Sequence, residues 1–162
     1  MEQIETWSDF NVAMVGATAA LAGLVIVAAS VNIGDIIKEP SLTARLAAGI
    51  SSLVLALIGS AIGLIPEVGP VPYGVAMIVI ALGAGLFQVQ ATRRIFENQH
   101  PANRMRWLKS AVGFVAPLAY LIGGALLAAG QPAGLAWFAV GSIVAIGAAL
   151  LVSWIVLVEV LR

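Results

Sequence analysis

The sequence predicts an all-α integral membrane protein, built as one bundle of five transmembrane helices. Hydrophobic residues make up 61% of the 162 residues and charged residues only 10%, whereas a soluble domain carries about a quarter charged residues. The apolar residues fall into five runs, each long enough to cross about 30 Å of hydrocarbon as a helix. Basic residues, in contrast, are concentrated between two of these runs. We therefore expect a single transmembrane domain over residues 1–162, with no soluble domain attached.

The first two spans are predicted in the N-terminal half of the chain. Residues 1–9 contain acidic residues but no Lys or Arg, so they lack the basic start of a signal peptide and are expected to remain on the mature protein. The first span is predicted over residues 10–33. The second is predicted over residues 42–65, with Ser41 as its N-cap. It is expected to stop at residues 66–72, PEVGPVP, because three prolines and a glycine cannot continue a helix.

Three more spans complete the predicted bundle. The third covers residues 73–91, and its helix is expected to continue beyond the bilayer through Glu97. The fourth covers residues 107–129 and contains Pro117. We expect a kink there rather than a break, since neighbouring helices can satisfy the carbonyl that a proline leaves free. A short turn containing Gly and Pro then leads into the fifth span, residues 135–158.

The distribution of basic residues predicts how the bundle is oriented. Residues 93–109 contain five of the eight Lys and Arg residues, and basic loops of membrane proteins remain in the cytoplasm. With five spans, this placement also puts Lys38, Arg45 and Arg162 on the cytoplasmic side and leaves no Lys or Arg outside. The N-terminus is therefore predicted outside and the C-terminus in the cytoplasm.

The same basic face is expected to bind anionic lipid head groups, because each basic residue at the membrane surface adds about 1 kcal/mol of attraction to acidic lipid. Alternatively, these charges serve only to set the topology. The candidate lipid-binding residues are Arg93, Arg94, Arg104, Arg106 and Lys109.

The spans lack the residue types that membrane-embedded chemistry uses. No Asp, Glu, Lys, Arg or His lies in the middle of any predicted span, although such residues mark proton relays and ion-coupled sites. The single histidine, His100, has no Cys or second His with which to share a metal. We therefore expect no enzymatic activity, no proton-coupled transport, no metal or other cofactor, and no nucleic-acid partner.

Small residues recur at helical spacing and predict close helix packing. Such faces let helix backbones approach one another, which drives helix association in lipid. Either the helices of one chain use these faces among themselves, or copies of the chain associate through them. We expect a homo-oligomer in which the longest face, in the fifth span, is a packing surface. The residues are Gly59 and Gly63 in the second span, and Gly141, Ala145, Ala149 and Ser153 in the fifth.

Uncharged polar residues lie mainly toward the predicted cytoplasmic ends of the spans. One interpretation is a water-filled vestibule that opens to the cytoplasm and lines a pathway. The other is hydrogen bonding between helices, worth about 0.6 kcal/mol per contact, together with ordinary polarity at helix ends. The candidate pathway residues are Ser30, Asn32, Ser51, Gln88 and Gln90.

Three apolar stretches carry a family resemblance. Residues 16–33, GATAALAGLVIVAASVNI, the proline-bearing loop over residues 66–72 and the closing residues 153–160, SWIVLVEV, resemble an uncharacterised family of small bacterial five-span membrane proteins. The resemblance implies a location in the bacterial inner membrane. It implies no activity, and no functional residue is carried over from it.

Two classes of function follow from these observations. The first is a homo-oligomeric channel or passive carrier for a small ion or solute. The second is an accessory or scaffold subunit of a larger membrane complex, which the absence of a charged ring or filter loop favours. A closed ring with a cavity along or between its subunits would support the first, and a monomer or a cavity-free dimer the second.

Overall fold

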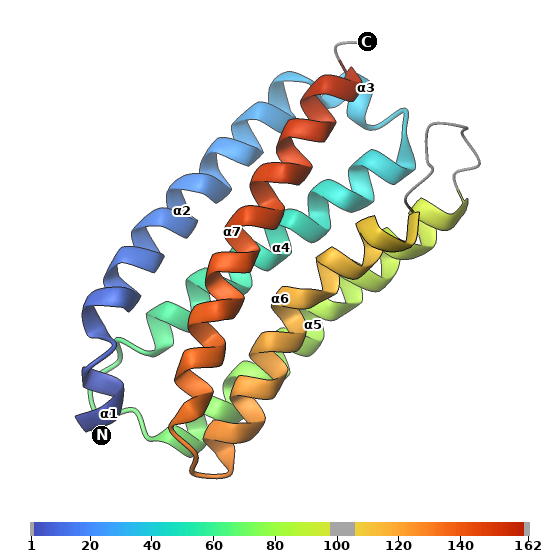
Figure 1. Ribbon diagram of the computed structural model, residues 1–162. Coiled ribbons are helices and arrows are strands. Elements are labelled where there is room, and N and C mark those ends of the chain that lie inside the picture. Colours follow the sequence, from blue (N-terminus) through green and yellow to red (C-terminus); the bar gives the residue numbers. More distant parts are fainter. Residues whose placement is uncertain (1, 98–105, 161–162) are drawn as a thin grey trace.

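The computed structural model describes residues 2–97 and 106–160, and all of the regular elements in these ranges are helices. Two single helical turns, α1 and α3, flank the first long helix (Figure 1). The helices are α1 (Glu2–Glu5), α2 (Ser8–Val31), α3 (Ile33–Ile36), α4 (Pro40–Ile62), α5 (Pro70–Glu97), α6 (Arg106–Ala128) and α7 (Ala133–Val160). Each of the five long helices includes between 19 and 28 residues that are apolar enough to cross a membrane. The predicted five-span, all-α fold is confirmed, and by helix length and hydropathy the chain is a multi-pass membrane protein.

Two predicted helix starts are wrong, and proline explains both. α4 begins at Pro40, with Glu39 in the N-cap position. Ser41 is therefore not the N-cap, and its hydroxyl instead donates to the Glu39 carboxylate over 3.2 Å. α5 begins at Pro70 rather than at residue 73. A proline is tolerated in the first turn because its missing N–H is one that a helix start leaves unpaired anyway.

Other features of the long helices agree with the prediction. α5 continues past the predicted span to Glu97, and Pro117 lies inside α6 without ending it. The turn between α6 and α7 depends on Gly130, whose φ of 77° lies in the left-handed region that favours glycine. The N–H groups of Gly130 and Gln131 bond to the last carbonyls of α6, over 3.0 and 2.8 Å, and this closes the helix.

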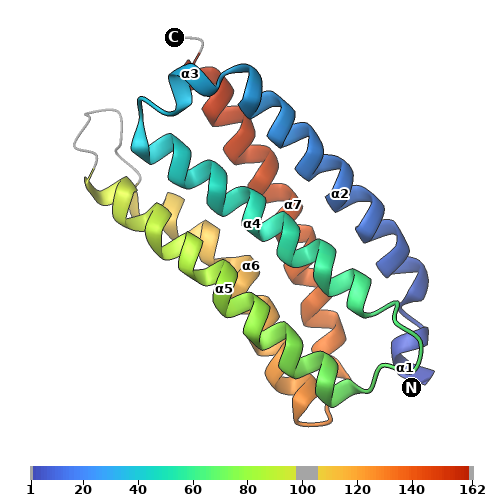
Figure 2. The same cartoon turned by 180° about the vertical axis from the view of Figure 1, so that it is seen from behind.

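The five long helices are arranged with α4 and α7 in the middle (Figure 1). α5 and α6 run side by side as an antiparallel pair, and α2 lies on the opposite side of the bundle (Figure 2). α4 packs against both α2 and α5, and α7 packs against both α4 and α6. One end of the bundle, the N-terminal end, holds α1, residues 63–69 and the α6–α7 turn. The other, the basic end, holds α3 and the described basic residues Lys38, Arg45, Arg93 and Arg94.

The core is divided into two clusters of buried side chains. The first draws on α1, α4, α5, α6 and α7 and includes Leu55, Tyr73, Met77, Tyr120 and Phe138. The second lies nearer the basic end and includes Val25, Ile36, Leu46, Leu53 and Ala149, from α2, α3, α4 and α7. No described residue of α5 or α6 belongs to the second cluster. The second cluster therefore joins α2, α3, α4 and α7 without α5 and α6.

Candidate functional site

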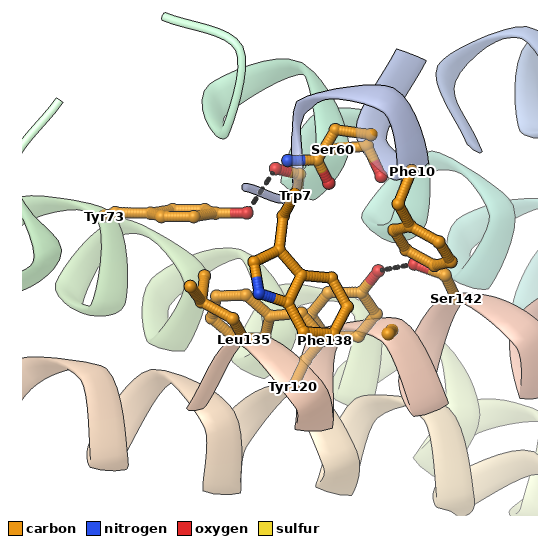
Figure 3. A pocket seen from close by; sticks show the side chains of 11 residues that line it. Trp7, Phe10, Ser60, Tyr73, Tyr120, Leu135, Phe138 and Ser142 are labelled. Atoms are coloured by element: carbon orange, nitrogen blue, oxygen red, sulfur yellow. Dashed lines mark hydrogen bonds between the residues drawn. The ribbon is translucent and has the colours of Figure 1, made fainter. Parts of the chain in front are cut away.

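Each of the five spanning helices contributes one buried polar side chain to a single small cavity near the N-terminal end (Figure 3). The five side chains are Asn11 of α2, Ser60 of α4, Tyr73 of α5, Tyr120 of α6 and Ser142 of α7. The cavity has a volume of about 10 Å³, which is the lower limit for holding one water molecule. We call these five residues the polar site.

Three of the five side chains are already hydrogen-bonded within the protein. The Tyr73 hydroxyl donates to the carbonyl of Gly59 over 2.8 Å. The Tyr120 phenol oxygen and the Ser142 hydroxyl oxygen lie 2.6 Å apart and share one hydrogen bond (Figure 3). The ring of Phe138 packs against both tyrosines, with centroid distances of 5.1 and 5.3 Å. A buried phenol needs such a partner, so these bonds fix the positions of the two rings.

The other two side chains have hydrogen-bonding capacity to spare. Asn11 is 6% exposed and Ser60 3% exposed, and neither side chain bonds to another described residue. Both line the cavity. A buried amide and a buried hydroxyl without a protein partner favour water or another polar molecule as their partner. The site is therefore chemically suited to a small, uncharged molecule that both donates and accepts hydrogen bonds.

The N-terminal segment contributes two aromatic side chains to the cavity wall. Trp7 and Phe10 both line the cavity, and both are half-buried. Their rings meet edge to face, with centroids 5.7 Å apart. Ile4 on α1 is buried in the first core cluster and holds this segment in place. The two aromatic side chains therefore form one part of the wall around the polar site.

The Gly59–Gly63 step of α4 gives the site the space that its side chains need. A Cβ atom on Gly59 would lie 2.8 Å from Cε of Met77 and 3.1 Å from the ring of Tyr120. On Gly63 it would lie 2.6 Å from the Asn11 amide nitrogen and 3.0 Å from the Tyr73 hydroxyl. Any larger residue at these two positions would displace side chains of the polar site.

The small-residue ridge of α7 is packed inside the chain for most of its length. A Cβ atom on Gly141 would lie 2.8 Å from the ring of Tyr120. Ala145 and Ala149 are 0% and 3% exposed. Ser153 is half-buried and donates to the carbonyl of Ala149 over 2.8 Å. Since the chain's own helices cover the ridge, association between copies has to use another surface.

The predicted pathway residues do not meet in one lining. Ser30 and Asn32 lie at the end of α2, where their side chains donate to carbonyls of their own helix, over 2.7 and 3.0 Å. Ser51 is half-buried in the middle of α4. On α5, Gln88 is buried against Gly113 of α6, while Gln90 is exposed. α2 and α5 lie on opposite sides of the bundle (Figure 2), so the two groups are far apart.

The predicted lipid-binding residues are only partly described. Arg93 and Arg94 are exposed near the end of α5, and Arg94 pairs with Glu97 over 2.9 Å. Arg104 and His100 lie outside the described residues. The backbones of Arg106 and Lys109 belong to α6, but their side chains lie outside the description. Within residues 2–97 and 106–160, no group of three or more His, Cys, Asp or Glu residues could hold a metal ion.

The polar site was not predicted from the sequence. The predicted pathway residues lie mostly near the basic end, and neither tyrosine was assigned a role. The useful signal was depth: each span carries one polar or phenolic residue at a similar distance from the N-terminal end. The protein's only two tyrosines are among these residues.

Comparisons with models of known protein families, with curated proteins and with solved structures gave no significant match. No family is thus identified for the chain, and its function has to be argued from the site.

Proposed function

We propose that this protein is a non-enzymatic passive carrier for a small, uncharged polar solute. The observation that carries the proposal is the polar site, in which all five spans place an uncharged polar side chain around one cavity. Amides and hydroxyls can replace part of a solute's hydration without holding it tightly, which suits passage through the site. The sequence has no ionisable residue in the middle of a span. Movement is therefore not expected to be coupled to protons or sodium.

A carrier fits the core better than an open channel does. Between the polar site and the basic end lies a layer of side chains that are at most 1% exposed: Leu55, Ala56, Met77, Ala81, Ala116 and Ala145. The buried hydroxyls at similar depth, those of Thr18 and Ser52, already donate to carbonyls of their own helices. A solute can cross it only if the helices move, and such movement is the defining feature of a carrier.

Charge supports an orientation with the N-terminal end outside. That end exposes Glu5, Asp9 and Glu67, whereas the basic end carries the described Lys and Arg residues. Since basic segments stay in the cytoplasm, the basic end would face inward across a bacterial inner membrane. The exposed Arg93 and Arg94 would then meet anionic lipid. Native mass spectrometry should show more retained anionic than zwitterionic lipid, and equal retention would remove this part of the proposal.

The proposal includes self-association through α2. Only 17% of the 18-residue apolar segment of α2 is buried within the chain. Gly16 and Gly23 are exposed, and nothing lies within 4 Å of where their Cβ atoms would be. Small outward-facing residues allow the helix of a second copy to approach closely. A homo-oligomer formed here would leave the polar site of each copy intact.

The carrier is tested by flux into liposomes. Liposomes containing the protein should equilibrate at least one member of a panel of small neutral solutes faster than protein-free liposomes. Water heads the panel because the cavity has room for about one water molecule, and urea and glycerol require the site to widen. Ser60→Ala should slow that flux about tenfold, the effect of losing one hydrogen bond of about 1.4 kcal/mol. Ser52→Ala is the matched control, because Ser52 is also buried in α4 but bonds to its own helix at Ala48. If no solute of the panel passes, the alternative of an accessory or scaffold subunit replaces the carrier.

A further inference from the structure

Two buried hydroxyl groups, one on α5 and one on α6, have no hydrogen-bond partner among the described residues. They are Oγ1 of Thr92 and Oγ of Ser110, and Ser110 is only 6% exposed. Thr18 and Ser52, which are also buried within spans, donate to carbonyl oxygens four residues earlier on their own helices, over 2.6 and 3.1 Å. A hydroxyl that is buried between helices cannot turn to water instead. Each unpaired hydroxyl therefore destabilises the packing in which Thr92 and Ser110 lie.

The two hydroxyls lie at the same level of one interface. Gln88 is buried directly against Gly113, because a Cβ atom there would collide with the Gln88 amide. Thr92 lies about one turn beyond Gln88 along α5, and Ser110 about one turn before Gly113 along the antiparallel α6. Both steps lead toward the basic end. We call the interface formed by these four residues the seam.

α6 contains a proline, Pro117, about one turn from the seam. Pro117 has no N–H, so the carbonyl of Gly113, four residues earlier, lacks its helical hydrogen bond. Helices bend at such positions. On the other side of Pro117, α5 and α6 are pressed together at backbone level. A Cβ atom on Gly74 would lie 2.6 Å from the carbonyl oxygen of Gly124, and one on Gly124 would lie 2.8 Å from the carbonyl oxygen of Gly74.

We propose that the seam is a gate on the basic side of the bundle, which opens by movement of α6 about Pro117. The end near Gly74 and Gly124 stays packed, while the half of α6 before Pro117 separates from α5. Nothing in the second core cluster opposes this movement, since no described residue of α5 or α6 belongs to that cluster. In the open state the hydroxyls of Thr92 and Ser110 and the Gln88 amide bond to water or to the neutral solute. The gate extends the proposed function. Its purpose rests on the carrier, but its test does not.

The gate is tested by cysteine labelling, for which the protein is well suited because it contains no Cys. The protein carrying Ser110→Cys is treated in lipid nanodiscs with a water-soluble maleimide. The control is Leu46→Cys on α4, which is 9% exposed, lies near the same end and belongs to the second core cluster. If the seam opens, Ser110→Cys reacts at least about tenfold faster than Leu46→Cys. Adding Pro117→Ala, which restores the missing N–H, then slows the labelling of Ser110→Cys severalfold.

Two results would overturn the gate: equal labelling of the two cysteines, or labelling of Ser110→Cys that Pro117→Ala leaves unchanged. The measurement does not require flux, so it separates the two proposals. Labelling without flux in liposomes leaves the gate standing and removes the carrier. Flux with a seam that never labels removes the gate and leaves the carrier.

Discussion

The phenol oxygen of Tyr120 on α6 lies 2.6 Å from the hydroxyl oxygen of Ser142 on α7, and both residues are 1% exposed. The bond joins two helices at the centre of the polar site. It can form because Gly141, next to Ser142, has no side chain to hold the ring of Tyr120 away. One small residue and one hydroxyl on consecutive positions of α7 thus position the same tyrosine.

Removing the phenolic hydroxyl of Tyr120 should lower the free energy of unfolding by about 1 kcal/mol. This is the scale of hydrogen bonds between helices in membranes. Tyr120→Phe keeps the ring but leaves the Ser142 hydroxyl buried without its partner. The double variant Tyr120→Phe/Ser142→Ala removes both polar groups and should therefore lose less than the sum of the two single variants. Unfolding in mixed micelles measures the free energies. A strictly additive double variant would show that the bond contributes nothing.

A large side chain on the ridge of α7 should destabilise each copy of the chain. Ala145→Leu adds atoms at a position with 0% exposure and should cost about 1–3 kcal/mol or prevent folding. Gly147→Leu, two residues further along α7, enters open space, because nothing lies within 4 Å of a Cβ atom there. Thermal unfolding in detergent compares the two. Equal stability of both variants with the wild-type protein would contradict the packing described for Ala145.

Topology can be measured with single cysteines at the two ends of the bundle. Gln131→Cys lies at the exposed α6–α7 turn of the N-terminal end, and Lys38→Cys is exposed at the basic end. In intact cells a membrane-impermeant maleimide should label Gln131→Cys, and it should label Lys38→Cys only after the membrane is permeabilised. The reverse pattern would invert the proposed orientation, and with it the side on which the gate lies.

Self-association should depend on α2 rather than on the ridge of α7. Gly16→Leu places a bulky group on the outward face of α2 and should reduce the mass of the purified particle to that of one chain. Gly83→Leu is the control, because Gly83 is an exposed glycine of α5 with equally open surroundings. Native mass spectrometry reads the subunit number directly. A wild-type protein that is already a monomer would remove this part of the proposal.

Hydropathy was sufficient to predict the five spans and their order, because each apolar run is long and the segments between runs contain charge, Gly or Pro. α5 starts at Pro70, three residues before the predicted span, although its prolines favour the end of a helix. They lie in the first turn of the helix, where a proline costs little. Local sequence thus predicts that a helix exists more reliably than where it begins.

The polar site could not be predicted in the same way. Asn11 and Ser142 are far apart in the sequence. They line the same cavity because of how each helix is rotated about its axis. Helix rotation depends on the packing of all five spans. The spacing of Gly141, Ala145 and Ala149 likewise predicted a packing face but could not show which helix would cover it. The ring of Tyr120 on α6 covers Gly141, and Gly49 on α4 lies beside Ala149, so different helices cover different parts of the face.

The position of α7 in the sequence has a consequence for biosynthesis. α7 supplies Leu135 and Phe138 to the first core cluster, Ala149 to the second, and the serine that binds Tyr120. Because the ribosome makes the chain from its N-terminus, this helix is the last of the five to reach the bilayer. Until then α6 holds a phenol in lipid without its partner, and neither cluster is complete. A nascent chain interrupted before residue 133 would therefore be an unfinished bundle with a polar group exposed to hydrocarbon, the form that membrane quality control can distinguish from the finished protein.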